Sequence, residues 1–533
     1  MIMRTDMLQG ASLALNQMRF ATMVASQNIN NADNPNYARN VVIFQMDDAG
    51  NVSAGPKRMS NFFLTEQLNQ STSDLTYAKN IASVSGSVDK IVTGVVANGE
   101  GSSSNPIAQG FQDINASLTA IATDDSHAGR STLLSRINTL LTTTSSMYSH
   151  LEQYNTQIDS ELKSGATSLN AQAEQLAKVN GRLRSNPNDP KLVTQRDSII
   201  SEMSKQAKLD VYESENGMVD VKVANGYDLV RGTDASKITT GPDEFGRNTQ
   251  IYINGDMIRD GEQLGGLLGS NMVIRDEVIA ETERSVAHVV VGYMNELNNL
   301  NSAGFTSDGA AGGDLIYIPP SKAKARTSNT GDGGLTISVV PGSTASMQPN
   351  AISVEKLASG YKFTDTKTGE EKLVASLPTE VFGFKVEGSG AINVGDKFEM
   401  DPLSDMLKSS KLVANEDDIA AAGSTPASEG DKANLQKIAS LSSAKIFSNG
   451  DDSTTQALAK VFTDIGNSTV AAEQSLSTAA SINENASLRW NNLSGVNTQE
   501  EELNMLKYQQ IYQSISKVIE TDQKMFDSLI SII

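Results

Sequence analysis

The chain has 533 residues, enough for several domains, and carries 43 basic against 63 acidic side chains, for a formal net charge of −20. This acidic excess excludes a general electrostatic attraction to nucleic acid or to anionic lipid. The chain has no cysteine and only three, widely separated histidines, which leaves few parts for thiolate, metal or triad chemistry, so we expect no enzyme activity, no cofactor and no metal.

The N-terminal segment predicts one amphipathic helix. From Arg4 to Ala32, small or apolar residues recur three and four positions apart, which is the spacing of a heptad seam. Asp6 and Arg19 interrupt the apolar core that a signal peptide would need, so we expect no cleaved signal. No window of about 18 apolar residues predicts membrane insertion. The seam consists of Leu8, Ala11, Leu15, Met18, Thr22, Ala25, Ile29 and Ala32.

The next part of the chain predicts a helical rod with a small β region. Between residues 133 and 183 the apolar residues keep a period near 3.5, which predicts one long helix. Residues 208–260 alternate in hydrophobicity and contain turn sequences, as β-hairpins do. A second long helix is expected from Gly265 to Asn298. The glycines from Gly261 to Gly269 lack the Lys-Ser or Lys-Thr of a phosphate loop, so they predict a packing turn.

A change of composition marks an inserted domain. From about residue 320 to 430 the chain becomes rich in Thr, Val, Gly and Ser, with strand-like runs at 335–340, 381–386 and 397–400. The helical pattern resumes near Lys432 and ends in a second seam that only Asp522 interrupts. The two seams have the spacing needed to pack on each other. The second seam consists of Met505, Tyr508, Tyr512, Ile515, Ile519, Asp522, Phe526, Leu529 and Ile533.

These elements predict a mainly α fold with β insertions, in which a long helical-bundle rod is built from both chain ends and carries a mainly β outer domain. Apolar seams at both extreme ends suit a subunit that completes its fold in an assembly. The expected domains are a terminal coiled-coil assembly domain (1–50 and 497–533) that is disordered in the monomer, a helical rod domain (51–320 and 431–496) that includes the hairpins of 208–260, and the inserted outer domain (321–430).

The run from Ala25 to Arg39 resembles the N-terminal signature of bacterial flagellar rod, hook and hook-associated proteins. That signature is an Asn-rich helix end followed by Thr-Pro-Gly-Tyr, and the matching residues here run from Asn34 through Pro35 to Tyr37. Asn36 stands where glycine is commoner. A type II turn needs a positive φ at that position, and asparagine is the best substitute for glycine there. We therefore expect a positive φ at Asn36.

Further blocks resemble the hook-associated protein 1 family in particular. The resemblance implies a structural subunit that forms the junction ring between hook and filament and is required for filament assembly. It also implies export through the flagellar type III channel without a cleaved signal, and an extracellular location on the flagellum. The blocks are Gln195 to Asp197, Gly226 to Val230, Gly265 to Leu268, Gly395 to Phe398, Ser494 to Asn497 and Tyr508 to Gln510.

The resemblance also implies partners and an interface. The partners are the hook protein, a second junction protein (hook-associated protein 3), further copies of this chain in a ring, and a cytoplasmic export chaperone that binds the C-terminal helix. Two alternatives stay open: another flagellar axial protein of the hook or rod, or an enzyme or adhesin displayed on the flagellum through the insert at 321–430. The expected assembly interface consists of Leu8, Ala11, Leu15, Met18, Ala25, Ile29, Asn34, Pro35, Tyr37, Tyr508, Tyr512, Ile515, Ile519, Phe526 and Leu529.

Overall fold

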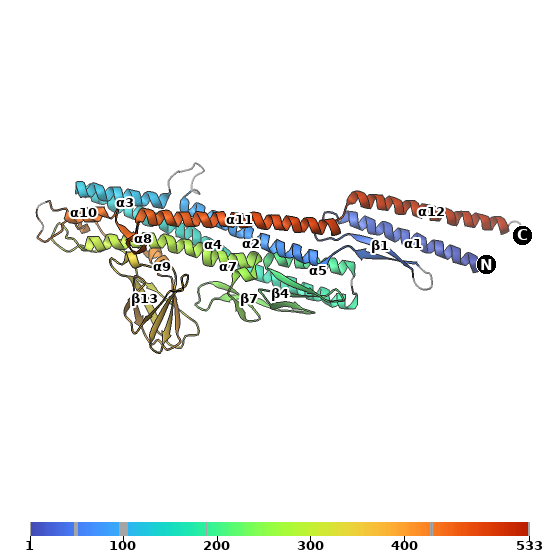
Figure 1. Cartoon of the computed structure of the whole chain (residues 1–533), viewed down its shortest axis with the longest axis horizontal. Helices are drawn as coiled ribbons and strands as arrows, with labels where there is room; N and C mark the ends of the chain where they lie inside the picture. Colours follow the sequence, from blue (N-terminus) through green and yellow to red (C-terminus); the bar gives the residue numbers. More distant parts are fainter. Residues whose placement is uncertain are drawn as a thin grey trace.

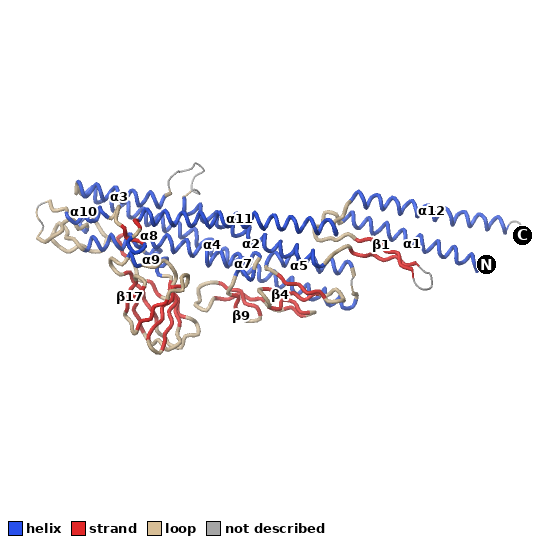
Figure 2. The backbone as a smooth tube through the Cα atoms, viewed as in Figure 1, coloured by secondary structure: helices blue, strands red, loops and turns tan. Residues whose placement is uncertain are grey.

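The computed structural model describes residues 2–46, 52–94, 105–187, 189–426, 428 and 430–530. Long helices run along an elongated molecule, both chain ends lie at one tip, and two β regions are attached to one side of the rod (Figure 1). Figure 2 shows that most strands belong to these two side regions and to a hairpin near the chain ends. The expected fold class, mainly α with β insertions, is confirmed.

The rod is a bundle in which α2 packs along α11, and α4 packs against α3 and α5. The long helix predicted between residues 133 and 183 is confirmed as α4, whose 59 residues span about 90 Å at 1.5 Å per residue. Its apolar stripe, including Ile137, Leu151 and Leu176, is fully buried in the core. The helices of the bundle are α2 (Phe62–Thr93), α3 (Pro106–Thr123), α4 (His127–Ser185), α5 (Pro190–Gln206), α10 (Ala433–Ser440) and α11 (Thr454–Ser494).

The helices of the bundle other than α10 begin where the sequence supplies N-caps. The side chains of Asn61, Asn105, Ser126, Asp189 and Ser453 each accept a hydrogen bond from a backbone N–H of the first turn that follows. These bonds satisfy donors that have no partner inside the helix. In α3 and α5 a proline also occupies the first turn, where its missing N–H costs nothing.

The helix predicted from Gly265 to Asn298 contains a π-helical turn. It comprises α7 (Gly266–Val273), the π-helix η1 (Ile274–Ile279) and α8 (Ala280–Ser302), and the short α6 (Gly261–Leu264) precedes it. A Cβ on Gly269 would lie 2.1 Å from the carbonyl oxygen of Gly261, so only glycine allows α6 to approach α7 this closely. The glycine-rich sequence thus makes the packing turn that was expected.

The first β region lies against α4 and contains the predicted hairpins (Figure 1). Ala224, Asn225 and Gly226 all have a positive φ, as the turn between β4 and β5 requires. One sheet has the order β3-β4-β5-β6 and the other the order β7-β8-β9. The strands are β3 (Leu209–Glu213), β4 (Val219–Val223), β5 (Tyr227–Arg231), β6 (Asp234–Ala235), β7 (Ile238–Pro242), β8 (Thr249–Ile253) and β9 (Asp256–Ile258).

The outer domain consists of two antiparallel sheets with the orders β11-β13-β18-β17 and β12-β19-β14-β15-β16. Apolar side chains from both sheets, among them Ile337, Phe363 and Phe398, are fully buried. The strands are β11 (Ser321–Lys322), β12 (Lys324–Ala325), β13 (Gly334–Val339), β14 (Ile352–Leu357), β15 (Gly360–Asp365), β16 (Glu371–Val374), β17 (Thr379–Val381), β18 (Phe384–Ser389) and β19 (Lys397–Met400), with the 3-10 turn η2 (Thr344–Ser346) between β13 and β14.

Two details of the insert differ from the expectation. The strand-like run at 381–386 is not one strand, because Phe382 and Gly383 have a positive φ and form a hairpin turn between the end of β17 and the start of β18. The sheets end at Met400, and the chain then returns to the rod through α9 (Pro402–Ser409). After α9, β20 (Lys411–Leu412) pairs with β10 (Ile316–Tyr317), so the chain enters and leaves the insert side by side. The remaining short elements are η3 (Glu416–Asp418), β21 (Lys445–Phe447), η4 (Ser448–Gly450) and β22 (Asp452–Ser453).

The close approach of α6 and α7 gives a matched pair of glycine substitutions. Gly269→Ala should lower the free energy of unfolding by about 1–3 kcal/mol, because its methyl group overlaps the backbone of Gly261. Gly466→Ala in α11 meets no atom within 4 Å and should raise the free energy of unfolding by about 0.5–1 kcal/mol. Denaturant unfolding of the two variants measures both effects, and equal effects would contradict the packing role of Gly269.

Candidate assembly interface at the chain ends

The two terminal helices lie side by side beyond the end of the rod (Figure 1). They are α1 (Ile2–Asn30) and α12 (Thr498–Ile530). An additional hairpin of β1 (Asn40–Met46) and β2 (Val52–Arg58), which was not expected from the sequence, packs against α1. The helical path is interrupted between α11 and α12. There the Asn497 side chain accepts hydrogen bonds from the backbone N–H groups of Gln499 and Glu500. The two chain ends therefore form one body at the tip of the molecule.

On α12 the expected interface residues share one half-buried face. Tyr508, Tyr512, Ile515, Ile519 and Phe526 are all half-buried. The opposite side of the helix is more than half exposed at four apolar residues: Leu503, Leu506, Val518 and Met525. The side chains of Leu529 and Ile533 lie outside the described residues. The pairing of two helices thus covers one face of α12 and leaves a second apolar face open to solvent.

On α1 burial increases along the helix. Leu8, Ala11, Leu15, Met18 and Ile29 are half-buried, whereas Ala25 is only 2% exposed. The other fully buried residues of α1 lie in its second half: Ala21, Val24 and Asn28. Two paired helices cannot bury both apolar faces of each helix, so the tip retains apolar surface.

The signature resembling flagellar proteins forms a buried polar cluster around Asn28. The side-chain amide of Asn28 donates to the backbone oxygen of Asn40 at 2.8 Å and to Oε2 of Glu501 at 2.9 Å. Its Oδ1 accepts from the Tyr37 hydroxyl at 2.9 Å and from the Asn40 backbone N–H at 3.0 Å. Asn28 is fully buried and Glu501 is 3% exposed. Asn28 therefore connects the end of α1 to the start of α12.

Arg39 lies at the edge of the same cluster and pairs with two of its glutamates. Its Nε lies 2.7 Å from Glu501 Oε1, its Nη2 lies 2.7 Å from Glu500 Oε1, and its backbone N–H donates to the oxygen of Ser494. The guanidinium supplies the positive charge that a buried Glu501 carboxylate requires. Glu500 and Glu501 also lie in the first turn of α12, where the helix dipole favours negative charge.

Two tyrosines next to this cluster keep their protons. Burial raises the pKa of Tyr37, and the neighbouring Glu501 carboxylate acts in the same direction. Burial also raises the pKa of Tyr508, which faces the same carboxylate. The Tyr37 hydroxyl therefore remains a donor to Asn28 through the physiological pH range.

The turn at Pro35 is not of the expected type. The Tyr37 backbone N–H donates to the Asn34 oxygen, so Pro35 and Asn36 occupy the central positions of a turn. Asn36 is not among the residues with a positive φ, which contradicts the type II turn. The Asn34 side chain instead accepts the Asn36 N–H at 3.1 Å, and this bond favours a turn without a left-handed residue. Asn34 and Pro35 are exposed, whereas Tyr37 is half-buried in the cluster.

A second network joins the tip to the rod. Arg58 at the end of β2 lies 2.8 Å from Oδ2 of Asp197 in α5, and Arg196 lies 2.8 Å from Oδ1 of the same carboxylate. Arg196 also pairs with Glu213 and donates to the oxygen of Gly217. The side chains of Arg58, Arg196 and Asp197 are each at most 7% exposed. In the sequence, Arg196 and Asp197 stand out only as part of a family-like block, and no local pattern points to their partner Arg58.

Within the described ranges, no group of three or more His, Asp or Glu residues is arranged to hold a metal ion directly. A search of the same part of the chain finds no helix with the length and apolar character needed to cross a membrane. The chemistry of the tip is that of packing, capping and buried ion pairs.

Comparison with known proteins identifies relatives of the whole chain. Residues 97–316 match the family model "Flagellar hook-associated protein FlgK helical domain", and residues 491–532 match "Flagellar basal body rod FlgEFG protein C-terminal". Flagellar hook-associated protein 1 of Escherichia coli (strain K12) is 26% identical over 561 aligned positions, which cover 99% of this chain and 100% of that protein. The chain is a full-length relative of flagellar hook-associated protein 1.

Other matches agree with this relationship. Flagellar hook-associated protein 1 of Salmonella typhimurium (strain LT2) is 24% identical over 99% of this chain and 100% of its own length. The solved structure of the flagellar hook junction protein FlgK from Burkholderia pseudomallei is 19% identical, covers 81% of this chain and 100% of that one, and superposes with a TM-score of 0.70. The solved FlgK structure thus shares this fold, and the resemblance stated from the sequence is confirmed.

Loss of the buried ion pairs between tip and rod should lower the free energy of unfolding more than loss of an exposed ion pair. Asp197→Ala leaves Arg58 and Arg196 buried without their carboxylate and should lower the free energy of unfolding by about 3–5 kcal/mol. Asp74→Ala removes an exposed pair with Lys208 and should cost less than about 1 kcal/mol. Denaturant unfolding compares the two, and an equal cost would contradict a structural role for the Asp197 network.

Proposed function

We propose that the chain is a structural subunit of the bacterial flagellum that forms the junction ring between hook and filament and is required for filament assembly. The observation that carries this proposal is the tip, where α1 and α12 are joined at Asn28 and Glu501 while apolar faces of both helices stay open. Such faces need neighbouring subunits to cover them. The full-length similarity to flagellar hook-associated protein 1 supports the same function.

The interface of this subunit consists of the two seams and the signature. In our proposal the half-buried residues Leu8, Leu15, Ile515 and Ile519 belong to a tube of helices that continues from one copy to the next. The terminal segments 1–50 and 497–533 are disordered in the isolated monomer and acquire their helices on assembly. The coupling of folding to assembly follows from the limited burial that two helices alone achieve.

The partners follow from the position of such a ring. We propose that the chain contacts the hook protein on one side and a second junction protein, hook-associated protein 3, on the other, with further copies of itself beside it. Export precedes assembly and needs no cleaved signal. A cytoplasmic export chaperone binds the segment of α12 before export, because the apolar residues of this segment would otherwise promote aggregation in the cytosol.

Charges placed in the seams should block assembly and spare the rod. Leu15→Glu and Ile519→Glu each put an unpaired charge on a half-buried face, so the variants should fail to support filaments in a strain lacking the native chain. The controls Asn16→Glu and Gln513→Glu add the same charge at exposed positions and should support filaments. Electron microscopy counts hooks that carry filaments, and circular dichroism of the purified variants verifies that the rod remains folded. Normal filaments with both seam variants would contradict the interface.

Loss of the whole chain tests the junction itself. In its source cell, deletion should leave bare hooks and release unpolymerised flagellin into the medium, because the filament has no base on which to grow. Immunoblotting of the medium and electron microscopy of hooks measure the two effects. Normal filaments after deletion would overturn the proposed function, and missing hooks would assign the chain to the hook or rod instead.

A further inference from the structure

A groove of about 560 Å³ lies where the tip meets the rod, between α1, the turn at Asn34, the β1 and β2 hairpin and the start of α5. A pocket of this size holds a ligand as large as several side chains. On α1 its lining includes Phe20, Val24, Gln27 and Asn31, which recur at three and four positions as a second stripe beside the seam. Among the residues that the structure describes, no seam residue of α1 and no residue of α12 lines this tip groove. The pairing of the two terminal helices therefore leaves the tip groove uncovered.

Apolar side chains at the surface line the tip groove. Phe20 is half-buried and Met23 is 47% exposed, and Pro56 of β2 and Pro190 of α5 add apolar surface from the other elements. Asn34, which the sequence assigns to the assembly interface, is exposed and also lines the groove. Large apolar side chains gathered in an exposed concave site mark a surface that another molecule covers.

The open face of α12 supplies a surface that could fill such a groove. Leu503 and Leu506 are both exposed and lie three residues apart, so their side chains are neighbours on one side of the helix. Tyr508 and Tyr512 lie on the opposite side, which is half-buried in the pairing with α1. The open face of α12 therefore points away from α1, and within one molecule it cannot reach the tip groove. A second copy of the chain can bring the two surfaces together.

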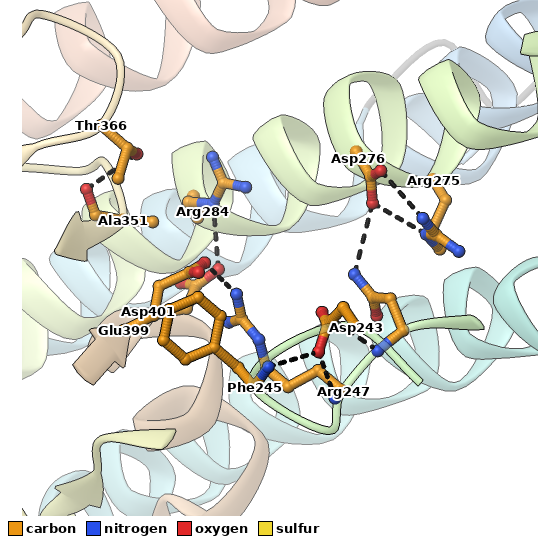
Figure 3. Close-up of polar contacts among 11 residues, drawn as sticks. Asp243, Phe245, Arg247, Arg275, Asp276, Arg284, Ala351, Thr366, Glu399 and Asp401 are labelled. Carbon is orange, nitrogen blue, oxygen red and sulfur yellow. Dashed lines mark hydrogen bonds and ion pairs between the residues drawn. The ribbon is translucent and has the colours of Figure 1, made fainter. Parts of the chain in front are cut away.

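The free charge of the tip groove is positive. Its lining holds one acidic residue, Asp189, whose Oδ1 accepts the backbone N–H groups of Lys191 and Leu192 as the N-cap of α5. The Lys191 side chain is exposed and has no ion pair within the described part of the chain. The buried guanidinium of Arg275, by contrast, is already bound by the Asp276 carboxylate, as Figure 3 shows. Lys191 is therefore available to a carboxylate of another molecule.

We propose that the tip groove of one copy binds the open face of α12 of a neighbouring copy, with Leu503 and Leu506 in the groove and Glu502 beside Lys191. Glu502 is exposed, lies four residues before Leu506 on the same side of α12, and has no ion pair within the described residues. Lys507, farther along α12, carries the opposite charge. The order of these two charges directs the end of α12 that carries Glu502 toward Lys191, because complementary charges fix the register of a contact.

This contact connects each copy to two neighbours. One neighbour inserts its α12 into the tip groove, and the α12 of the same copy enters the tip groove of the other neighbour. Such a contact between two different surfaces is heterologous, and it generates a ring when its rotation closes. The inference rests on the proposed function, since it assigns the surfaces through which adjacent subunits of the proposed ring meet.

A cross-link between engineered cysteines tests the contact directly, because the chain has no cysteine of its own. Met23→Cys and Leu506→Cys are placed on separate chains and produced together in a strain that lacks the native chain. Isolated hooks with filaments are then treated with a short bismaleimide, and we expect an adduct that contains one chain of each kind. Met23→Cys with Ile482→Cys is the control pair, because Ile482 on α11 is 54% exposed, close to the 52% of Leu506, and should give no adduct.

Charge reversal tests the register. Lys191→Glu and Glu502→Lys each place like charges in the contact, so each should reduce the fraction of hooks that carry filaments. The double variant restores an opposite pair and should recover filaments. Lys437→Glu makes the same change of charge at an exposed position of α10, far from the tip, and should assemble as the native chain does. Lys437→Glu combined with Glu502→Lys restores the net charge without the pair, and should therefore not recover filaments.

Each other outcome overturns the inference. Normal filaments without the adduct mean that the tip groove is not a contact between copies. An adduct of Met23→Cys with the hook protein or with the second junction protein, identified by mass spectrometry, assigns the groove to that partner. Equal adducts from the Ile482→Cys pair mean random collision, and no recovery in the double charge variant removes the pair of Lys191 and Glu502. All these outcomes leave the proposed function intact, which only normal filaments after deletion of the whole chain, or missing hooks, would overturn.

Discussion

The pairing of the two chain ends is the constraint on which the rest of the structure depends. The bond between Asn28 and Glu501 joins residues 473 positions apart in sequence. For the ends to meet, the chain must leave the tip along α2 and return to it along α11. All the elements from α3 to β22 lie between these two helices in the sequence. The rod lowers the entropic cost of closing this long loop, because the packing of α2 along α11 already holds the two chain ends close together.

The polar groups at the tip specify the geometry of the pairing, while the apolar faces supply its driving force. A seam of leucine, isoleucine and methionine allows two helices to slide by one turn, because one apolar side chain replaces another at little cost. Asn28, Arg39 and Glu501 do not allow this, since a shifted register would leave a buried carboxylate without donors. The same division appears between tip and rod, where Arg58 and Asp197 fix the position of the hairpin.

Features that repeat locally could be predicted from the sequence, and features that depend on distant partners could not. The long α4, the hairpins between β3 and β9 and the two terminal seams follow from periodicity and turn residues over short windows. The β1 and β2 hairpin was missed, although the run from Val41 to Phe44 has the β-branched and aromatic residues typical of a strand. The partner of Asp197 and the π-helical turn in η1 arise from tertiary packing, which no window of the sequence contains. At Asn36 the expectation of a type II turn with a positive φ was wrong, because the Asn34 side chain stabilises a different turn.

The paired strands β10 and β20 make the outer domain separable from the molecule that carries it. The chain enters the insert beside Tyr317 and leaves it beside Lys411, which face each other in the ladder. The distance between entry and exit is therefore set by two hydrogen-bonded strands and does not depend on the size or fold of what lies beyond them. The two sheets between β11 and β19 can then vary in size while the paired ends and the rod stay as they are, as long as α9 keeps its packing against α8.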